Sequence, residues 1–212
     1  MARTGRPRGF DRDEAIQHAM RLFWEQGYEA TSLAQLKAAM GGISSPSFYA
    51  AFGSKEALFQ TVLDCYLETH GRVTAPLNDP SLPPRDAIEQ ALLASAQMQA
   101  DTTHPLGCLL VLSTIAGSPE NRHLQAQMAA ERQRNRDGMC ACIRRAIAEG
   151  SLRPSTDADA LAAMFDTLLV GISIQARDGV PLAGIKAGIR EAMGVWDVRA
   201  TAPAFSEPRQ SH

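Results

Sequence analysis

Residues 31–55 contain two short helical patterns separated by a pair of glycines, and this arrangement limits the folds that the chain can adopt. The segment reads TSLAQLKAAMGGISSPSFYAAFGSK. Gly41 and Gly42 are predicted to end the first helix, because glycine adopts the left-handed backbone that follows a helix at low cost. Gly53 is predicted to end the second helix in the same way. Two short helices joined by a tight turn form a helix-turn-helix, whose second helix reads the major groove of DNA.

Polar side chains at the start of each helix supply the candidate DNA contacts. Thr31 and Ser32 have oxygens that can cap the first helix, and the serines around Pro46 suit the cap and first turn of the second. Lys55 is predicted in the first turn of the next helix, where the helix dipole disfavours a cation unless an anion such as a DNA phosphate is near. The alternative for this lysine is a solvated surface side chain. The candidate contacts are Thr31, Ser32, Ser44, Ser45, Pro46, Ser47, Ala50 and Lys55.

Residues 1–10 are predicted to form a flexible basic arm. The segment MARTGRPRG contains three arginines, two glycines and a proline and has no apolar pattern. Positive charge is concentrated here although the whole chain has a formal net charge of −2. Such an arm can follow the DNA backbone or the minor groove, and Arg6 and Arg8 are its candidate contacts. The alternative is a tail that only increases solubility.

The first 65 residues resemble the tetracycline-repressor-like (TetR/AcrR) family of regulators. The resemblance is carried by GRPRGFDRDEAIQHAMRLFWEQGYEATSLAQL and by MGGISSPSFYAAFGSKEALF. It implies a three-helix DNA-binding head in which residues 44–51 are the recognition segment. Tyr49 and Lys55 then occupy the positions that usually meet phosphate, and Thr31 or Ser32 opens the supporting helix.

The chain departs from the family pattern at two positions near the recognition segment. Many relatives have a single glycine where this chain has Gly41 and Gly42, and a histidine often stands where this chain has Ala51. A longer turn is expected to alter the angle of the recognition helix. Ala51 removes one possible phosphate contact.

The chain is predicted to be all-α, with about nine helices and no strand of useful length. Asp11 is expected to cap the first helix, and Asp157 the penultimate one. The helix that begins at Ser54 is expected to continue to about Val73, and four prolines in residues 74–84 predict a loop. The predicted organisation is a basic arm at 1–10, a helix-turn-helix DNA-binding domain at 11–70, a C-terminal regulatory and dimerisation domain at 71–198, and a disordered tail at 199–212.

The last two long helices are rich in small residues and apolar over more than one stripe, which requires cover on two sides. The resemblance implies that they pair with their copies in a four-helix dimer interface; the alternative is a tightly packed monomer core. A twofold dimer would present two recognition helices to half-sites about 34–36 Å apart or a multiple of that. The candidate interface residues are Ala160, Ala163, Gly171, Ile185, Gly188, Ile189 and Ala192.

A small-molecule pocket is expected between the helix that begins at Ser54 and the dimer helices. Its candidate residues combine apolar side chains with a few polar anchors, as ligand sites generally do. They are Gln97, Met98, Cys108, Leu112, Gln127, Met128, Phe165 and Leu169. The identity of the ligand is not readable from this set.

The sequence as a whole predicts a homodimeric, DNA-binding transcriptional repressor that an unknown small-molecule inducer releases from double-stranded operator DNA. One alternative is a thiol-based sensor that uses Cys108, because the start of a helix lowers the pKa of a thiol. A second alternative is a helical sensor whose head binds a protein partner instead of DNA.

No arrangement of residues predicts an enzyme, a metal site or a cofactor. The five histidines are scattered, and Cys140 and Cys142 are two apart and therefore on different faces of a helix. No membrane helix or secretory signal is recognised, so a cytoplasmic, nucleoid-associated protein is expected. Four cysteines in a chain of this length fit a reducing compartment.

Overall fold

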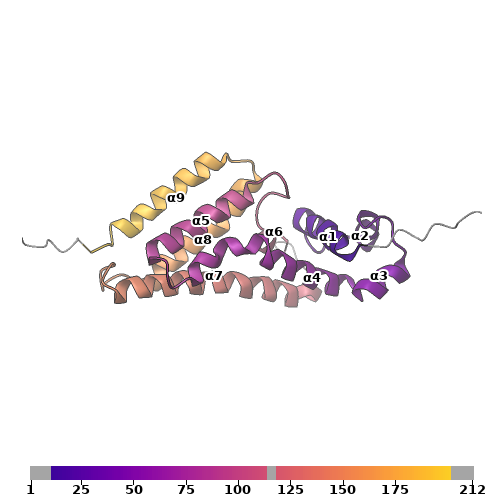
Figure 1. Cartoon of the computed structure of the whole chain (residues 1–212), viewed down its shortest axis with the longest axis horizontal. Helices are drawn as coiled ribbons and strands as arrows, with labels where there is room; N and C mark the ends of the chain where they lie inside the picture. Colours follow the sequence, from indigo (N-terminus) through magenta and orange to yellow (C-terminus); the bar gives the residue numbers. More distant parts are fainter. Residues whose placement is uncertain (1–10, 114–117, 202–212) are drawn as a thin grey trace, which may run out of the picture.

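The computed structural model describes residues 11–113 and 118–201, and these fold into helices (Figure 1). They form nine α-helices and two 3-10 helices, and they contain no strand beyond one isolated bridge between Leu152 and Ala200. The predicted all-α class is therefore confirmed. The arm at 1–10, with Arg6 and Arg8, lies outside the described residues.

The head consists of α1 (Arg12–Gln26), α2 (Leu33–Ala39), α3 (Ser45–Phe52) and α4 (Lys55–Glu68). A side-chain oxygen caps the start of each of these helices by accepting from an unpaired backbone amide. In α2 the cap is a reciprocal capping box, because Gln35 also reaches back to the cap residue. The four capping residues are Asp11, Ser32, Ser44 and Ser54.

The hydrophobic core of the head is aromatic and continues into the body. Phe23 and Phe59 pack edge to face with their ring centroids 5.1 Å apart, and both are fully buried. The same cluster includes Leu109 from α6 and Leu124 and Met128 from α7. The head and the body therefore share one continuous core at their junction.

The helix α4 ends five residues earlier than predicted. It stops at Glu68 and is followed by the 3-10 helix η1 (His70–Asn78), so the predicted continuation to Val73 and the predicted loop at 74–78 are both wrong. Thr69 breaks the helix with an irregular backbone and donates its hydroxyl to the Cys65 carbonyl at 2.7 Å. Pro76 would clash with the carbonyl four residues earlier in an α-helix, which favours the tighter 3-10 form.

The body contains α5 (Pro84–Gln99), α6 (Leu109–Leu112), the short 3-10 helix η2 (Pro119–Asn121), α7 (Arg122–Ala148), α8 (Ala158–Arg177) and α9 (Leu182–Asp197). Its core is a second apolar cluster built from α5, α7, α8 and α9. Figure 1 shows α9 toward the end of the molecule opposite to α3. The head therefore occupies one end of an elongated molecule.

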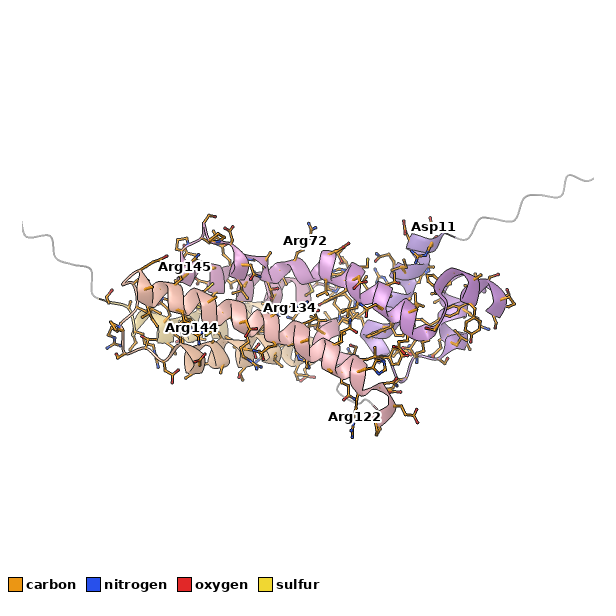
Figure 2. The ribbon with its side chains drawn as sticks, turned by 90° about the horizontal axis from the view of Figure 1, so that it is seen from below. Asp11, Arg72, Arg122, Arg134, Arg144 and Arg145 are labelled. Atoms are coloured by element: carbon orange, nitrogen blue, oxygen red, sulfur yellow. The ribbon has the colours of Figure 1, made fainter. Side chains whose placement is uncertain are left out.

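The long helix α7 runs along the body with exposed arginines, of which Figure 2 labels Arg122, Arg134 and Arg144, while Arg145 donates to the Pro80 carbonyl at 3.0 Å. Arg144 pairs with Asp159 of α8 at 3.0 Å. This charged side of α7 is typical of a solvent-facing surface.

The start of the predicted disordered tail is ordered. Thr201 donates its backbone amide to the Ser151 carbonyl at 3.1 Å, and Arg153 donates its amide to the Arg199 carbonyl at 3.0 Å. These bonds tie the end of α9 to the loop after α7. The expectation of disorder from residue 199 is therefore wrong for residues 199–201, and residues 202–212 lie outside the described part of the chain.

The helix α8 is, among the described residues, the one helix long and apolar enough to cross a membrane, with a mean hydropathy of 1.3. One side of it lies in the core of the body, where Phe165 and Ile172 are fully buried. Asp166 on this helix is also buried and pairs with Arg136 of α7 at 2.7 Å. Burial and this ion pair are what a core helix of a folded domain requires.

Candidate nucleic-acid interface and regulatory cavity

The helix α3 is held from one side and leaves its other side open. Phe48 and Phe52 anchor it in the core of the head, with 0% and 7% of their surface exposed. Pro46, Ser47 and Ala50 are exposed, and Tyr49 is 51% exposed, which is high for an aromatic residue. The small side chains of this exposed edge make α3 narrow enough to enter the major groove of DNA.

Two consecutive glycines form the turn before α3. Gly41 and Gly42 have φ angles of 80° and 76°, and Gly42 donates its amide to the Lys37 carbonyl at 2.9 Å. Nothing lies within 4 Å of a Cβ built on either glycine. The left-handed backbone, rather than lack of space, therefore favours glycine at both positions.

The serines at the start of α3 hold one another and a lysine of α2. Ser44 accepts from the Ser47 amide at 3.2 Å, and their hydroxyl oxygens are 2.9 Å apart. Lys37 donates from Nζ to Ser45 Oγ at 2.8 Å. Lys37 was not among the residues predicted from the sequence, although a lysine in the last turn of a supporting helix is a signal that could have found it. It places a cation beside the unpaired amides of α3, where an anion is favoured.

Thr31 does not lie on this surface. Its side chain is fully buried and donates to the Gly27 carbonyl at 2.7 Å, at the end of α1. The prediction that Thr31 contacts DNA is therefore wrong: the residue closes the preceding helix from inside the head. Ser32 is exposed and is the sole capping residue of α2.

Lys55 is positioned by an aromatic ring and not freely solvated. Its Nζ lies 4.2 Å from the centroid of the Tyr28 ring, a cation–π contact, and the side chain is half-buried. Burial lowers the pKa of Lys55, while the charge of Glu29 acts in the opposite direction. The ammonium is therefore held close to the start of α4, next to α3.

Several hydrogen bonds fasten the C-terminal end of α1 to the body. Arg177 of α8 donates to the Glu25 carbonyl at 2.6 Å, and the indole of Trp24 donates to the Gly107 carbonyl at 3.2 Å. Glu29 accepts from the Ser118 amide at 2.9 Å and from its hydroxyl at 2.7 Å. The hydrogen bond from Asn121, followed by those from Ser118, lowers the pKa of Glu29 to about 2. The end of α1 is therefore held by hydrogen bonds from α8 and from the segments before α6 and η2.

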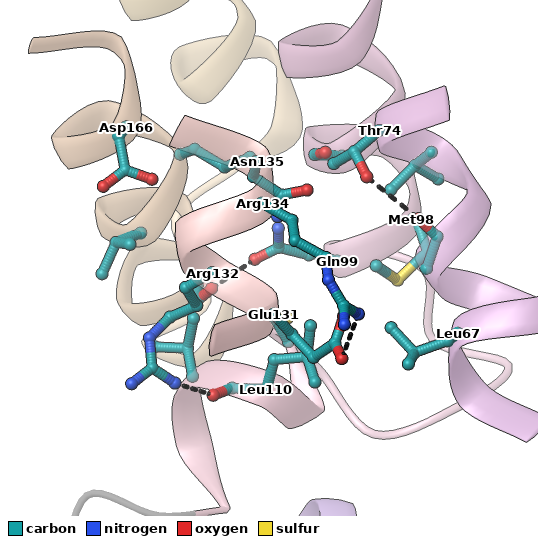
Figure 3. Close-up of a pocket in the computed structure, with 18 of the residues that line it drawn as sticks. Leu67, Thr74, Met98, Gln99, Leu110, Glu131, Arg132, Arg134, Asn135 and Asp166 are labelled. Carbon is teal, nitrogen blue, oxygen red and sulfur yellow. Dashed lines mark hydrogen bonds and ion pairs between the residues drawn. The ribbon is translucent and has the colours of Figure 1, made fainter. Parts of the chain in front are cut away.

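A cavity of about 200 Å³ lies in the body between the end of α4, η1, α5, α6, α7 and α8 (Figure 3). Three of the eight predicted pocket residues line it: Met98, Cys108 and Leu169. Its wall also contains Tyr66 and Leu67 from the last turn of α4. One helix therefore begins next to α3 and ends at the cavity.

The other five predicted pocket residues point elsewhere. Gln97 is exposed and accepts from Lys186 Nζ at 2.9 Å, and Gln127 donates to Gln60 of α4 at 2.6 Å. Met128 belongs to the core of the head and Phe165 to the core of the body, while Leu112 lies against the backbone at Gly107. Their placement in the pocket was wrong because the orientation of each helix about its axis depends on packing across the whole domain.

Two polar residues that were not predicted from the sequence, Ser95 and Gln99, line the wall of the cavity. Ser95 and Gln99 are one turn apart on α5, and both are buried. They interrupt a buried stripe that is otherwise formed by residues such as Ala91 and Leu92. Polar residues on the apolar side of a helix are the signal that could have identified them.

Cys108 lacks the environment of an activated thiol. It precedes a helix of only four residues, and Tyr66 donates its hydroxyl to Cys108 Sγ at 3.3 Å. Burial raises the pKa of the Cys108 thiol despite that hydrogen bond. The expectation of a lowered pKa at this position is therefore wrong.

The small residues of the predicted dimer interface form an exposed stripe on α8 and α9, whereas the two isoleucines do not. Ala160, Ala163 and Gly188 are exposed, and Gly171 and Ala192 are partly exposed. Ile185 and Ile189 are 3% and 0% exposed and belong to the core of the same protomer. Their assignment to the interface was wrong, because the larger apolar residues of α9 face inward.

Two regions of the chain match known family models. Residues 15–62 match the family described as bacterial regulatory proteins, tetR family. Residues 85–178 match the tetracyclin repressor-like C-terminal domain. The two matches cover the helix-turn-helix region and most of the body.

The chain is also similar to two transcriptional repressors and to a regulator solved with operator DNA. The HTH-type transcriptional repressor ComR of Escherichia coli (strain K12) is 32% identical over 198 residues, which cover 91% of each chain. BdcR of the same organism, another HTH-type transcriptional repressor, is 30% identical over 82% of this chain and 83% of its own. A cysteine mutant of the TetR family transcriptional regulator CifR has been solved in complex with 26-bp double-strand operator DNA. Its sequence is 41% identical to this chain, and the match covers 90% of this chain and 100% of that chain. The TM-score of the two structures is 0.81.

Proposed function

Because the chain belongs to the tetR family of bacterial regulatory proteins, we propose that it is a homodimeric repressor that a small molecule releases from operator DNA. The exposed, narrow edge of α3 carries the DNA-binding part of this proposal. Similarity to two repressors and to a regulator solved with operator DNA supports it. Such a protein acts in the cytoplasm, where the operator is accessible.

In the proposed complex α3 lies in the major groove. Pro46, Ser47 and Ala50 offer short polar and methyl contacts to base edges, while Tyr49 donates its hydroxyl to a phosphate. The ammonium group of Lys37, from α2, lies at the start of α3, and Lys55 lies at the start of α4, where both would contact the DNA backbone on either side of the groove. Since no arginine or glutamine stands on the exposed edge of α3, DNA shape contributes to the choice of sequence.

DNA binding is tested by titrating the purified protein into labelled DNA from upstream of its own gene. Fluorescence anisotropy of the labelled DNA measures the affinity. We expect binding to that DNA to be tighter than to a scrambled duplex of the same length, and to weaken as salt rises. Equal, weak binding to both duplexes would favour the alternative in which the head binds a protein partner.

Replacing Lys55 with alanine should weaken binding to operator and scrambled DNA by the same factor. The reason is that the lost contact is to phosphate, which carries no base information. The slope of log affinity against log salt should become shallower by about one. Lys186→Ala, on the body, is the matched control and should leave both affinity and slope unchanged. An unchanged slope in Lys55→Ala would remove this lysine from the contact surface.

The dimer is proposed to form through the exposed stripe of α8 and α9. On α8 the stripe runs through Ala160, Ala163 and Gly171 to Ile174, which is 44% exposed. On α9 it includes Gly188, where an added Cβ would meet no atom of the same protomer within 4 Å. Small side chains allow close approach of helices, and an exposed apolar stripe on an apolar helix such as α8 fits a second copy.

Ala163→Arg should convert the dimer into a monomer. The new side chain meets solvent in the free protomer, so the fold is retained, but in the dimer it would bury a charge without a partner. Sedimentation velocity measures the change directly. Ala130→Arg, at an exposed position on α7, is the matched control and should stay dimeric. A dimeric Ala163→Arg protein would place the interface on a different surface.

The inducer is proposed to occupy the cavity of the body and to act on α3 through α4. The 14 residues of α4 span about 21 Å, from Lys55 next to α3 to Tyr66 and Leu67 in the cavity wall. A ligand that shifts the last turn of α4 would therefore also move the start of this helix, which lies next to α3. The contact from Arg177 to the end of α1 transmits movement of α8 in the same way. A coupling of about 1–3 kcal/mol changes DNA affinity about 5- to 150-fold.

A further inference from the structure

Ser95 is a buried hydroxyl in the cavity wall that has no hydrogen-bond partner. It lies on α5, is 1% exposed, and its Oγ is unpaired. A serine within a helix often donates to the carbonyl four residues earlier, but this serine does not. Because an unpaired buried hydroxyl destabilises the folded state, its presence at this position needs an explanation. A ligand oxygen in the cavity would supply the missing partner after a rotation about χ1.

Gln99 offers a second donor on the same side of α5. Its Oε1 accepts from Ser173 Oγ at 2.7 Å, which fixes the orientation of the side-chain amide. Its Nε2 is the donor end of the same amide, and the side chain lines the cavity although it is only 3% exposed. Ser95 and Gln99 are four residues apart and therefore neighbours on the helix surface. Together they provide two donors for one oxygen atom.

Three of the four charged residues of the cavity wall are in ion pairs, and the fourth, Arg132, is hydrogen-bonded to a backbone carbonyl. Glu131 pairs with Arg134, which Figure 3 shows at the cavity. Asp166 pairs with Arg136 at 2.7 Å, and Arg132 donates to a backbone carbonyl of α6. A charged ligand would have to displace one of these partners or lose its own hydration without compensation. The arrangement favours a neutral ligand.

Most of the remaining wall is apolar, although Thr74, Asn78, Asn135 and Ser173 also line it, and the space is small. Leu67, Met98, Leu110, Leu169 and Val170 contribute to it, and the volume is about 200 Å³. A cavity of about 150 Å³ is known to hold benzene, so this one suits a ligand of roughly eight to ten non-hydrogen atoms.

We infer that the cavity binds a neutral, mainly apolar ligand of roughly eight to ten non-hydrogen atoms, whose single carbonyl or hydroxyl oxygen accepts from Ser95 Oγ and Gln99 Nε2. The inference rests on the proposed function in one respect, namely that this ligand is the inducer. Binding itself is measured on the full chain without DNA.

Four probes with the same seven-carbon skeleton separate the possible ligand classes by calorimetry: 1-heptanol, 2-heptanone, heptanoate and heptylamine. We expect the two neutral probes to bind at least about tenfold more tightly than either charged probe, since burial of an unpaired ion is disfavoured. Tighter binding of heptanoate would overturn the inference in favour of an anionic ligand at Arg132. Tighter binding of heptylamine would overturn it in favour of a cationic ligand at Glu131 or Asp166.

Ser95→Ala should leave the thermal stability of the free protein unchanged or higher, and it should lower the affinity for the ligand. It removes an unpaired buried hydroxyl, so the Tm of the free protein should stay the same or rise. It should weaken the binding of 2-heptanone about fivefold, the effect of one ordinary hydrogen bond. Ser155→Ala, at an exposed loop position, is the matched control and should change neither quantity. Unchanged 2-heptanone affinity in Ser95→Ala would remove Ser95 from the site.

The same probes in the anisotropy assay distinguish failure of the inference from failure of the proposed function. Ser95-dependent binding of 2-heptanone that leaves operator affinity unchanged would support the ligand class and contradict its role as inducer. Normal operator binding by a protein to which no neutral probe binds would overturn the ligand class and leave the DNA-binding proposal intact.

Discussion

Ala50→Glu should abolish operator binding while leaving the fold and the dimer intact. Ala50 is exposed on α3, beside Tyr49, and glutamate is a good helix former, so the free protein tolerates the change. In the proposed complex the new carboxylate lies among DNA phosphates. At about 7 Å and an effective dielectric constant of about 20, each phosphate repels it by about 2 kcal/mol. Operator affinity should therefore fall at least about 100-fold.

Anisotropy with labelled operator DNA measures this loss, and circular dichroism with sedimentation velocity checks the fold and the dimer. Ala130→Glu, on the exposed side of α7, adds the same charge far from α3 and should bind DNA normally. If Ala50→Glu bound operator like the unmodified protein, α3 would not be the element that enters the groove, and the proposed DNA interface would be wrong.

Gly107→Ala should destabilise the protein by about 3 kcal/mol, because two separate costs add. Gly107 has a φ of 84°, where a residue with a Cβ loses about 1–2 kcal/mol. The new Cβ would also lie 2.5 Å from Leu112 Cδ1 and 2.9 Å from the Ser173 carbonyl oxygen. The first contact can move, but the second is backbone, so overpacking adds about 1–3 kcal/mol.

Gly41→Ala is the matched control for the backbone cost alone. Gly41 has a φ of 80°, close to that of Gly107, but nothing lies within 4 Å of its added Cβ. The free energy of unfolding of Gly41→Ala should therefore be only about 1–2 kcal/mol lower than that of the unmodified protein. Urea unfolding at one protein concentration compares the two variants through the shift of the midpoint. Equal shifts would show that the packing around Gly107 relaxes without cost.

The start of each head helix was predictable from the sequence because the interactions that fix it are local. Asp11, Ser32, Ser44 and Ser54 each accept from an amide two or three residues further along the chain. A window of four residues therefore contains all the relevant chemistry. The end of α4 was not predictable in this way, because it depends on Thr69, on Pro76 and on the packing of η1 against α5.

The lining of the cavity was harder to predict because each helix has an apolar side that serves either a core or a cavity. Phe165 and Leu169 are one turn apart on α8 and both belong to the core of the body, yet of the two it is Leu169 that also lines the cavity. Periodicity assigns both to the buried side and does not distinguish them. Buried polar residues distinguish the two environments better, because a serine such as Ser95 is disfavoured in an apolar core, where its hydroxyl has no hydrogen-bond partner.

Thr31 and the isoleucines of α9 show the same difficulty at the surface. A threonine before a helix can cap it or can close the preceding helix from inside, and Thr31 does the latter. Ile185 and Ile189 share a helix with Gly188, but α5 and α8 cover the isoleucines and leave the glycine exposed. Residue type alone predicts that such positions are apolar, while the assembly of the body decides which of them are accessible.

The apolar cluster that joins head and body has a consequence for engineering new target specificity. If the first 70 residues of a relative replaced those of this chain, Leu109, Leu124 and Met128 would pack against different side chains from the ones that they contact here. A chimera would therefore keep a well-packed junction between head and body only if α6 and the first two turns of α7 were transplanted together with the head.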